Sequence, residues 1–447
     1  MGKLFGTDGI RGVANKFPMD AETALIVGWA VASYLKANHA APHLVIGQDT
    51  RLSGNMLAQA VGAGICAAGA DVIHFGILPT PAIAHLVVAT GAVAGIVISA
   101  SHNPYEDNGI KVFNADGLKL SDEAEDHIEG LFFCHSKLSK ADSNHIGSLR
   151  TLDNAAEQYI SFLQEAVSQL SLKGLTVALD CANGATYETA PRLFKKLGAE
   201  VIPLFCSPNG ININHDCGSQ HPESLAHTVV ERGAHIGLAF DGDGDRLIAV
   251  DEKGSILTGD QLIAICAKHL QKEGLLRNNT VVTTVMSNMG LTAALDKMGV
   301  RLVKTQVGDR YVMEKMLIED ATLGGEDSGH LIFRDVHTTG DGLMAALRLL
   351  DAIHSAQQPL SKLSKIMTVF PQELINVEVQ KKPDLKAEPD IARAIGDAEW
   401  ALGEQGRVLV RYSGTQNLCR VMVEGPTRDQ TRAICQSIAT VVKKRLA

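Results

Sequence analysis

The chain has 447 residues, which is too long for one ordinary hydrophobic core and predicts three or four domains. A formal net charge of −9 and the lack of a basic stripe in the sequence argue against a nucleic-acid-binding protein. The most apolar segment, residues 92–98, is far too short to span a bilayer, so we expect no membrane association.

The cysteines point to a reducing compartment. None of the eight cysteines forms a C-x-x-C pair, so the sequence lacks the usual spacing of cysteine ligands to zinc. Most of them stand in apolar runs, as buried free thiols do in a reducing compartment. The residues that follow Met1 lack the apolar stretch of a secretory signal peptide. We therefore expect a cytoplasmic protein.

Three successive stretches repeat one order of elements: a short apolar strand, a glycine-rich turn and an amphipathic helix. This alternation predicts an α/β fold with three similar domains, each a mainly parallel, mixed sheet covered by helices. The predicted strands span residues 43–47, 71–75, 95–98, 175–180, 200–204, 235–240, 280–285 and 301–305. The predicted helices span residues 55–70, 81–90, 191–197, 224–232, 260–272, 291–298, 311–318 and 341–355.

The pattern changes after about residue 365. Strand-like runs at 374–379, 407–411 and 418–423 are interleaved with helices, and the last helix spans 427–446. This order predicts a smaller C-terminal α+β domain with an antiparallel sheet. We place the domain boundaries so that the four domains span residues 1–150, 151–253, 254–367 and 368–447.

Three carboxylates, those of Asp241, Asp243 and Asp245, alternate with glycines directly after an apolar strand. Three acids so close repel one another, so we expect a hard divalent cation between them. The spacing is similar to that of an EF-hand calcium loop, but Arg246 stands where that loop needs glycine, and residues 247–250 read as a strand. An open three-carboxylate site favours Mg²⁺. The alternative is an acidic turn exposed to solvent.

A second polar segment lies just past the predicted strand 95–98, where open α/β sheets place their ligands. It offers the nucleophilic hydroxyl of Ser101, the neighbouring His102 and the nearby Lys111. The alternative is a simple polar turn, because Asn-Pro at 103–104 and Asn-Gly at 108–109 are strong turn dipeptides.

Two further polar loops carry hydrogen-bonding side chains. The first, at 324–330, could grip sugar hydroxyls through Glu326, Ser328 and His330, or it could be a solvated turn. The second offers guanidiniums, hydroxyls and main-chain N–H groups, which are the donors that a phosphate monoester needs, although a hairpin turn would read the same way. Its candidate residues are Arg411, Ser413, Gly414, Thr415 and Arg420.

In this order, the four segments resemble the serine, metal, sugar and phosphate loops of the α-D-phosphohexomutase superfamily. Within it, residues 5–12, 98–104, 304–312 and 420–425 are similar to the bacterial phosphoglucosamine mutases. The resemblance implies three similar α/β domains and a C-terminal α+β domain around a central cleft. It also implies interconversion of glucosamine 6-phosphate and glucosamine 1-phosphate for amino-sugar and cell-wall precursors. Glucosamine 1,6-bisphosphate would be the intermediate and activator.

The same resemblance assigns a role to each candidate residue. Ser101 would carry the phosphoryl group and, with the three aspartates, hold one Mg²⁺ per chain. Lys111 and His330 would be the candidate bases, and Arg11 would hold the phosphoserine end. The sugar phosphate would be bound by Arg246, Glu326, Ser328, Arg411, Ser413, Gly414, Thr415 and Arg420.

The sequence departs from the superfamily pattern at four positions: Gln48, Tyr412, Gln416 and Asn417. The nearest rival function is that of a phosphomannomutase or phosphoglucomutase, which would use every catalytic part in common. A non-catalytic sugar-phosphate sensor is a rival of another class, and the combination of Ser101 with three aspartates argues against it. We count a homodimer among the expected assemblies.

Overall fold

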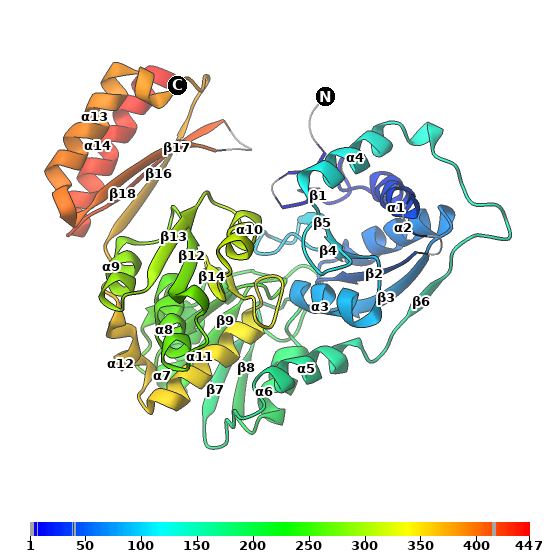
Figure 1. Ribbon diagram of the computed structural model, residues 1–447, viewed down its shortest axis with the longest axis horizontal. Helices are drawn as coiled ribbons and strands as arrows, with labels where there is room; N and C mark the ends of the chain where they lie inside the picture. The colour runs from blue at the N-terminus through cyan, green and yellow to red at the C-terminus, as the bar shows by residue number, and fades with distance from the viewer. Residues whose placement is uncertain (1–3, 7, 38, 40–41, 414–416) are drawn as a thin grey trace. The chain divides into compact units, whose positions relative to one another are not determined.

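The structure is a computed structural model that describes residues 4–6, 8–37, 39, 42–413 and 417–447 (Figure 1). The chain divides into two compact units. The larger unit comprises Met1–Val285 with Arg301–Lys365, and the smaller unit comprises Met286–Val300 with Ile366–Ala447. Among the described residues, no helix has both the length and the apolar character needed to cross a membrane.

The first sheet of the larger unit has six strands in the order β1-β5-β4-β2-β3-β6. The neighbouring strands β4, β2, β3 and β6 are parallel to one another, whereas β5 runs antiparallel to both β4 and β1. The strands are β1 (Ile10–Val13), β2 (His43–Gln48), β3 (Asp71–Ile77), β4 (Ala94–Ile98), β5 (Asp107–Asn114) and β6 (Leu149–Thr151). The accompanying helices are α1 (Ala21–Lys36), α2 (Gly54–Ala67), α3 (Thr80–Thr90) and α4 (Asp122–Phe133).

Two more mixed sheets complete the larger unit, with strand orders β11-β10-β9-β7-β8 and β13-β12-β14-β15. The strands are β7 (Thr176–Asp180), β8 (Glu200–Leu204), β9 (Ile236–Phe240), β10 (Leu247–Val250), β11 (Ile256–Leu257), β12 (Thr280–Thr284), β13 (Arg301–Thr305), β14 (Leu323–Gly325) and β15 (Leu331–Phe333). The helices are α5 (Ala155–Ala166), α6 (Thr189–Lys196), α7 (Glu223–Arg232), α8 (Gly259–Lys272), α10 (Asp309–Glu319), α11 (Gly342–Ala356) and α12 (Leu360–Leu363). The predicted α/β class with three sheets of this kind is confirmed.

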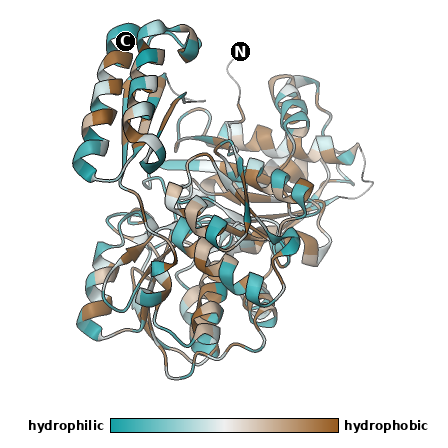
Figure 2. Ribbon diagram, turned by 60° about the vertical axis from the view of Figure 1, so that its left-hand side comes forward, coloured by the Kyte–Doolittle hydropathy of each residue, from teal (hydrophilic) through white to brown (hydrophobic). Residues whose placement is uncertain are grey.

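The smaller unit is built on an antiparallel sheet in the order β16-β18-β17. Side chains of β18, among them Val421 and Val423, pack with Ile438 and Val442 into one buried cluster, so the helices cover a single sheet face. Figure 2 shows hydrophobic and hydrophilic bands along the helix that ends at the C-terminus, as expected for this packing. The elements are α9 (Met289–Lys297), β16 (Gln372–Glu378), α13 (Pro389–Leu402), β17 (Arg407–Tyr412), β18 (Leu418–Glu424) and α14 (Arg428–Leu446).

Helix α9 lies in the smaller unit although we assigned its residues to the predicted domain 254–367. The buried carboxylate of Glu424 accepts a hydrogen bond from the main-chain N–H of Met289 at 3.0 Å. The side chain of Asn288 donates to the carbonyl of Phe370 at 3.0 Å. These contacts join α9 to the C-terminal sheet, and the four domain boundaries themselves stay a prediction.

Strand β5 differs from the sequence-based expectation. We read Asn108-Gly109 as a possible turn, but both residues lie inside β5, paired with β1. A Cβ atom at residue 109 would lie 2.5 Å from the carbonyl oxygen of Ser99. The glycine therefore serves a close approach of two main chains rather than a turn.

Helices α1 and α2 touch through their main chains at two glycines. A Cβ atom at Gly28 would lie 2.1 Å from the carbonyl oxygen of Val61, and one at Gly64 would lie 2.0 Å from that of Leu25. No side chain larger than hydrogen fits at either contact without moving the helices apart.

We predict that Gly64→Ala destabilises the larger unit by about 1–3 kcal/mol, because the added methyl group overpacks a main-chain contact. The matched control is Gly130→Ala in α4, where a Cβ atom would meet nothing within 4 Å. The control should be neutral or gain up to about 1 kcal/mol from helix propensity. Urea unfolding monitored by circular dichroism measures both, and equal midpoints for the two variants would contradict the close packing.

Candidate active site

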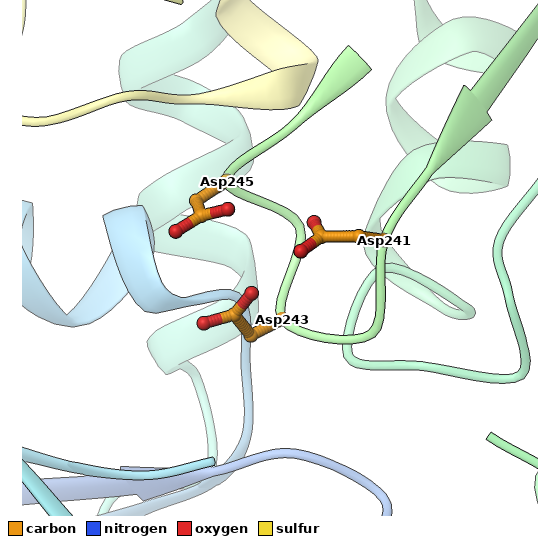
Figure 3. A group of neighbouring side chains, drawn as sticks. All are labelled: Asp241, Asp243 and Asp245. Atoms are coloured by element: carbon orange, nitrogen blue, oxygen red, sulfur yellow. The ribbon is translucent and has the colours of Figure 1, made fainter. Parts of the chain in front are cut away.

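The acidic loop between β9 and β10 places three carboxylates at one buried point (Figure 3). Asp241, Asp243 and Asp245 are only 1%, 1% and 6% exposed, and their ligand oxygens lie within 4.8 Å of one another. Gly244 adopts a left-handed conformation with φ 72°, which lets the loop turn back on itself. The alternative of a solvent-exposed acidic turn is therefore wrong.

The donor set of this loop fits a hard divalent cation. Burial, followed by the charges of Asp245 and Asp243, raises the pKa of Asp241 well above its ordinary value. One oxygen of Asp243 and one of Asp245 are buried without a hydrogen-bond partner in the part of the chain that the structure describes. A cation bound by these carboxylates would reduce the repulsion between them and would give the two buried oxygens a partner. Mg²⁺ prefers oxygen ligands of this kind.

Ser101 reaches this acidic loop from another sheet. It follows β4 in a left-handed conformation with φ 53°, and its hydroxyl donates to Asp241 Oδ2 at 2.6 Å. His102 Nδ1 lies 3.3 Å from the same hydroxyl. A Cβ atom at Gly242 would lie 2.5 Å from the carbonyl oxygen of Ser101, so the glycine allows the two loops to meet.

Lys111 and Arg11 bring positive charge to the same place. Lys111 extends from β5, and its Nζ lies 2.9 Å from Asp243 Oδ2, 3.4 Å from Asp8 and 3.9 Å from Asp245. Burial alone would lower the pKa of Lys111, but these carboxylates raise it above its ordinary value. The guanidinium of Arg11 donates to the carbonyl of Ala100 at 3.4 Å, beside the serine.

His330 approaches the cluster from the turn between β14 and β15. Its Nδ1 lies 3.6 Å from Asp245 and its Nε2 lies 3.7 Å from Asp309. Burial would lower the pKa of His330, but the charge of Asp245 and a hydrogen bond to it raise the pKa to about 9. The carboxylates of this arrangement therefore favour the protonated forms of His330 and Lys111.

The remaining predicted sugar-binding residues lie around this histidine. The main-chain N–H of Arg246 donates to Asp241 Oδ1 at 3.2 Å, and its side chain lies 3.9 Å from Asp245. Glu326 is half-buried and accepts from the main-chain N–H of Gly308 at 3.2 Å. Ser328 is exposed to solvent.

The predicted phosphate loop belongs to the smaller unit. Arg411 and Arg420 are directly opposed in the β17–β18 ladder, and the Nε atom of each is buried without a hydrogen-bond partner among the described residues. Burial, and then the charge of Arg420, lowers the pKa of Arg411. Ser413 is buried, and Gly414 and Thr415 lie outside the described residues. Two opposed guanidiniums repel each other, so an anion bound by both would stabilise the pair.

The whole chain matches known protein families. Models of the phosphoglucomutase/phosphomannomutase family match it as α/β/α domain I at residues 2–138, domain II at 157–254, domain III at 258–370 and the C-terminal domain at 374–441. The chain belongs to this phosphohexomutase family.

Its curated relatives define a branch within the phosphohexomutases. It is 54% identical to a phosphoglucosamine mutase of Syntrophus aciditrophicus over 100% of both chains, and 53% identical to one of Syntrophobacter fumaroxidans over 99% of both. The predicted resemblance to phosphoglucosamine mutases is thereby confirmed, as is the prediction of an isomerase.

Solved structures of phosphohexomutases share the fold. A phosphoglucomutase/phosphomannomutase family protein of Burkholderia thailandensis superposes with a TM-score of 0.81 at 26% identity, covering 99% of this chain and 98% of that one. An N-acetylphosphoglucosamine mutase of Aspergillus fumigatus, solved with GlcNAc-6P and magnesium, gives a TM-score of 0.68 at 15% identity, covering 99% and 96%.

Sequence reasoning missed part of the charge network of this phosphohexomutase. Lys119 Nζ lies 2.5 Å from Asp8 and 2.5 Å from Asp309, which links two predicted domains. Thr80 donates its hydroxyl proton to Asp243 at 2.7 Å. Asp8 and Asp309 stood in segments that we matched to the superfamily, but no local pattern pointed to Lys119 or Thr80.

We predict that Asp243→Asn weakens Mg²⁺ binding, because it removes one anionic ligand. Thermal melts at a series of Mg²⁺ concentrations should show that Mg²⁺ raises the melting temperature of the wild type. The Mg²⁺ concentration that gives half of this rise should be at least about tenfold higher in the variant. Even changes to groups that only contact a metal ligand reduce metal affinity by about tenfold or more. The control is Asp251→Asn, another buried aspartate of this unit that accepts main-chain N–H bonds from Lys253 and Ser255. An identical Mg²⁺ response in wild type and Asp243→Asn would show that the loop holds no cation.

Proposed function

We propose that the chain interconverts glucosamine 6-phosphate and glucosamine 1-phosphate, with Ser101 as the carrier of the phosphoryl group. The observation that carries this proposal is the 2.6 Å contact of the Ser101 hydroxyl with Asp241, inside a buried cluster of carboxylates and cations. A structural serine needs only one hydrogen-bond acceptor for its hydroxyl. A phosphorylated serine, in contrast, needs both a cation site and positively charged side chains beside it.

The reaction consists of two phosphoryl transfers. In the first, the P–O bond of phosphorylated Ser101 breaks as a bond forms to the free hydroxyl oxygen of the sugar phosphate, which gives glucosamine 1,6-bisphosphate. The sugar hydroxyl loses its proton to a base, and the leaving Ser101 oxygen takes up a proton, with the reverse proton movements in the second transfer. In the second transfer, the other phosphate of the bisphosphate moves to the Ser101 hydroxyl, so the phosphoserine is restored and the isomeric sugar phosphate is released.

Asp241, Asp243, Asp245 and an oxygen of Ser101 would hold one Mg²⁺ in this reaction. When bound, the cation supplies neutralisation of the charge on the transferring phosphoryl group. Arg11, which contacts the carbonyl of Ala100, holds the phosphoserine end of the site.

Lys111 and His330 are the bases that we propose for the two half-reactions. Lys111 on β5 and His330 in the turn between β14 and β15 approach the same carboxylate, that of Asp245, at 3.9 Å and 3.6 Å. A base must be deprotonated before it can accept a proton, and the surrounding carboxylates favour the charged form of both groups. The base role therefore depends on compensation of this negative charge in the loaded site.

We assign recognition of the substrate to the remaining predicted residues. Arg246, Glu326 and Ser328 bind the sugar in both of its orientations. The phosphate that does not react is bound by Arg411, Ser413, Gly414, Thr415 and Arg420. This second set is supported by Arg411 and Arg420, which lie opposite each other in the β17–β18 ladder and whose Nε atoms have no hydrogen-bond partner among the described residues.

We further propose a cytoplasmic location and a homodimeric assembly. All eight cysteines are free, which is in keeping with a reducing compartment. The homodimer stays a prediction, and size-exclusion chromatography with light scattering tests it.

We predict that Ser101→Ala abolishes turnover, because the variant lacks the oxygen that carries the phosphate. Intact-mass measurement of the wild type after incubation with glucosamine 1,6-bisphosphate should show one added phosphate, and the variant should show none. The melting temperature of the variant should stay near that of the wild type, since the change removes only the hydroxyl group and keeps the main-chain hydrogen bonds of the loop. Turnover by a folded Ser101→Ala variant would rule out the serine mechanism.

We predict a higher kcat/KM for glucosamine 6-phosphate than for glucose 6-phosphate or mannose 6-phosphate. The basis is the full-length identity to phosphoglucosamine mutases. Coupled assays with the three sugar phosphates at equal enzyme and Mg²⁺ concentration measure the ratio. Equal or better use of mannose phosphate would favour the phosphomannomutase/phosphoglucomutase rival, whereas failure with all three would favour a sugar-phosphate sensor.

A further inference from the structure

We infer that Arg51 is a positioning residue of the phosphoryl transfer, because it holds the Ser101 loop by its main-chain carbonyl groups. The inference rests on the proposed role of Ser101. Arg51 is only 2% exposed, and its guanidinium lies on the main-chain side of the serine loop. It therefore acts through Ser101 rather than on the substrate.

The guanidinium of Arg51 uses all five of its N–H donors. Three of the acceptors belong to the loop that follows β4, the fourth is the first residue of β5, and the fifth is an aspartate two residues away in the sequence. The acceptors are the carbonyl oxygens of Ser101 (2.9 Å), Asn103 (2.7 Å), Asp107 (2.9 Å) and Pro104, and the carboxylate of Asp49 (2.8 Å).

Asp49 extends this clamp to the other side of the serine. Its Oδ2 also accepts from the Ser99 hydroxyl at 2.5 Å, and the Ser99 oxygen in turn accepts from the main-chain N–H of Ser101 at 3.0 Å. The N–H and the carbonyl of Ser101 are thus both held by one ion pair, whose two side chains are fully buried. The opposite charges balance each other, so neither is left unpaired in the interior.

The clamp sets the direction of the nucleophile. Ser101 has φ 53°, a left-handed conformation that is unfavourable for a residue with a Cβ atom. In this conformation its hydroxyl lies 2.6 Å from Asp241 Oδ2. Loss of the hydrogen bonds to the Ser101 carbonyl would let the residue return to a more favourable conformation and move its hydroxyl away from the acidic loop.

A clamp on the main chain also suits a residue whose side chain changes charge. During the proposed cycle, the oxygen of Ser101 alternates between a neutral hydroxyl and an anionic phosphate. The contacts of Arg51 are with carbonyl oxygens, which stay the same in both forms. The loop can therefore keep one position through both half-reactions.

The test is Arg51→Lys, which keeps the positive charge beside Asp49 but cannot spread five donors over the loop. Wild type and variant are loaded with glucosamine 1,6-bisphosphate and mixed with glucosamine 6-phosphate in a quenched-flow apparatus. The rate constant of transfer from Ser101 should fall about 10²-fold, the loss expected when a reacting group is misplaced by about 1 Å. The fraction of enzyme that carries phosphate and the KM should not change.

The matched control is Arg348→Lys, another buried arginine, which pairs with Asp335 at 2.7 Å in the same unit. It should lose a similar amount of thermal stability and keep the wild-type rate constant. A purely structural role of Arg51 would lower the fraction of active enzyme in Arg51→Lys and leave the rate constant of the remainder unchanged, and this result would overturn the inference.

A second variant keeps the inference testable if Arg51→Lys does not fold. Asn214 donates from its side chain to the same Ser101 carbonyl at 2.9 Å and is only partly buried. Asn214→Ala should lower the transfer rate constant by a smaller factor, and an unchanged rate constant would overturn the clamp. A wild-type enzyme that acquires no phosphate on Ser101 would refute the proposed function itself, which separates the two failures.

Discussion

The burial of several carboxylates in one small volume is the constraint on which the larger unit depends. Removing a carboxylate from water costs several kcal/mol unless a cation or a set of hydrogen bonds compensates it. Lys111 contacts three of these acids, and Lys119 joins Asp8 to Asp309. The acidic loop still has oxygens without partners among the described residues. The fold therefore supplies part of the compensation and leaves the rest for a cation.

Meeting this constraint requires main chains from different sheets to come closer than side chains normally permit. A Cβ atom at Gly329 would lie 2.2 Å from the carbonyl oxygen of Leu247, beside the acidic loop. One at Gly340 would lie 2.4 Å from the ring of His330. Gly329 thus stands where loops of two sheets meet, and Gly340 makes room for the His330 side chain, so the packing of the larger unit and the geometry of the acidic cluster depend on the same contacts. A change at such a glycine would disturb packing and the proposed reaction together.

The sequence predicts the residues of the site better than their partners. The acidic loop and the serine loop each have a local pattern, because their polar residues follow one another within a few positions directly after a strand. The long-range pairs have no such pattern: Lys119 lies 111 residues from Asp8, and Lys111 lies 132 residues from Asp243. Only the folded chain brings these charges together.

Arg51 illustrates the same limit in another way. Gln48, three residues before Arg51, stands out in the sequence as a departure from the superfamily pattern. The sequence does not reveal the role of Arg51. The reason is that four of its five acceptors are main-chain carbonyls, which every residue possesses and no motif reveals. The extent of β5 was missed for a related reason, since Asn108-Gly109 favours a turn in isolation and becomes part of a strand only when β1 pairs with it.

The two units carry unmet charge of opposite sign, and this contrast explains how an acidic protein suits an anionic ligand. The acidic loop of the larger unit holds excess negative charge, and the Arg411–Arg420 pair of the smaller unit holds excess positive charge. The formal net charge of −9 reveals neither the acidic loop nor the arginine pair, because it sums over the whole chain. A divalent cation matches the carboxylates of the larger unit, and an anionic group such as a phosphate matches the guanidiniums of the smaller unit. Recognition by such a protein depends on these local excesses, and the total charge affects only the long-range approach of the ligand.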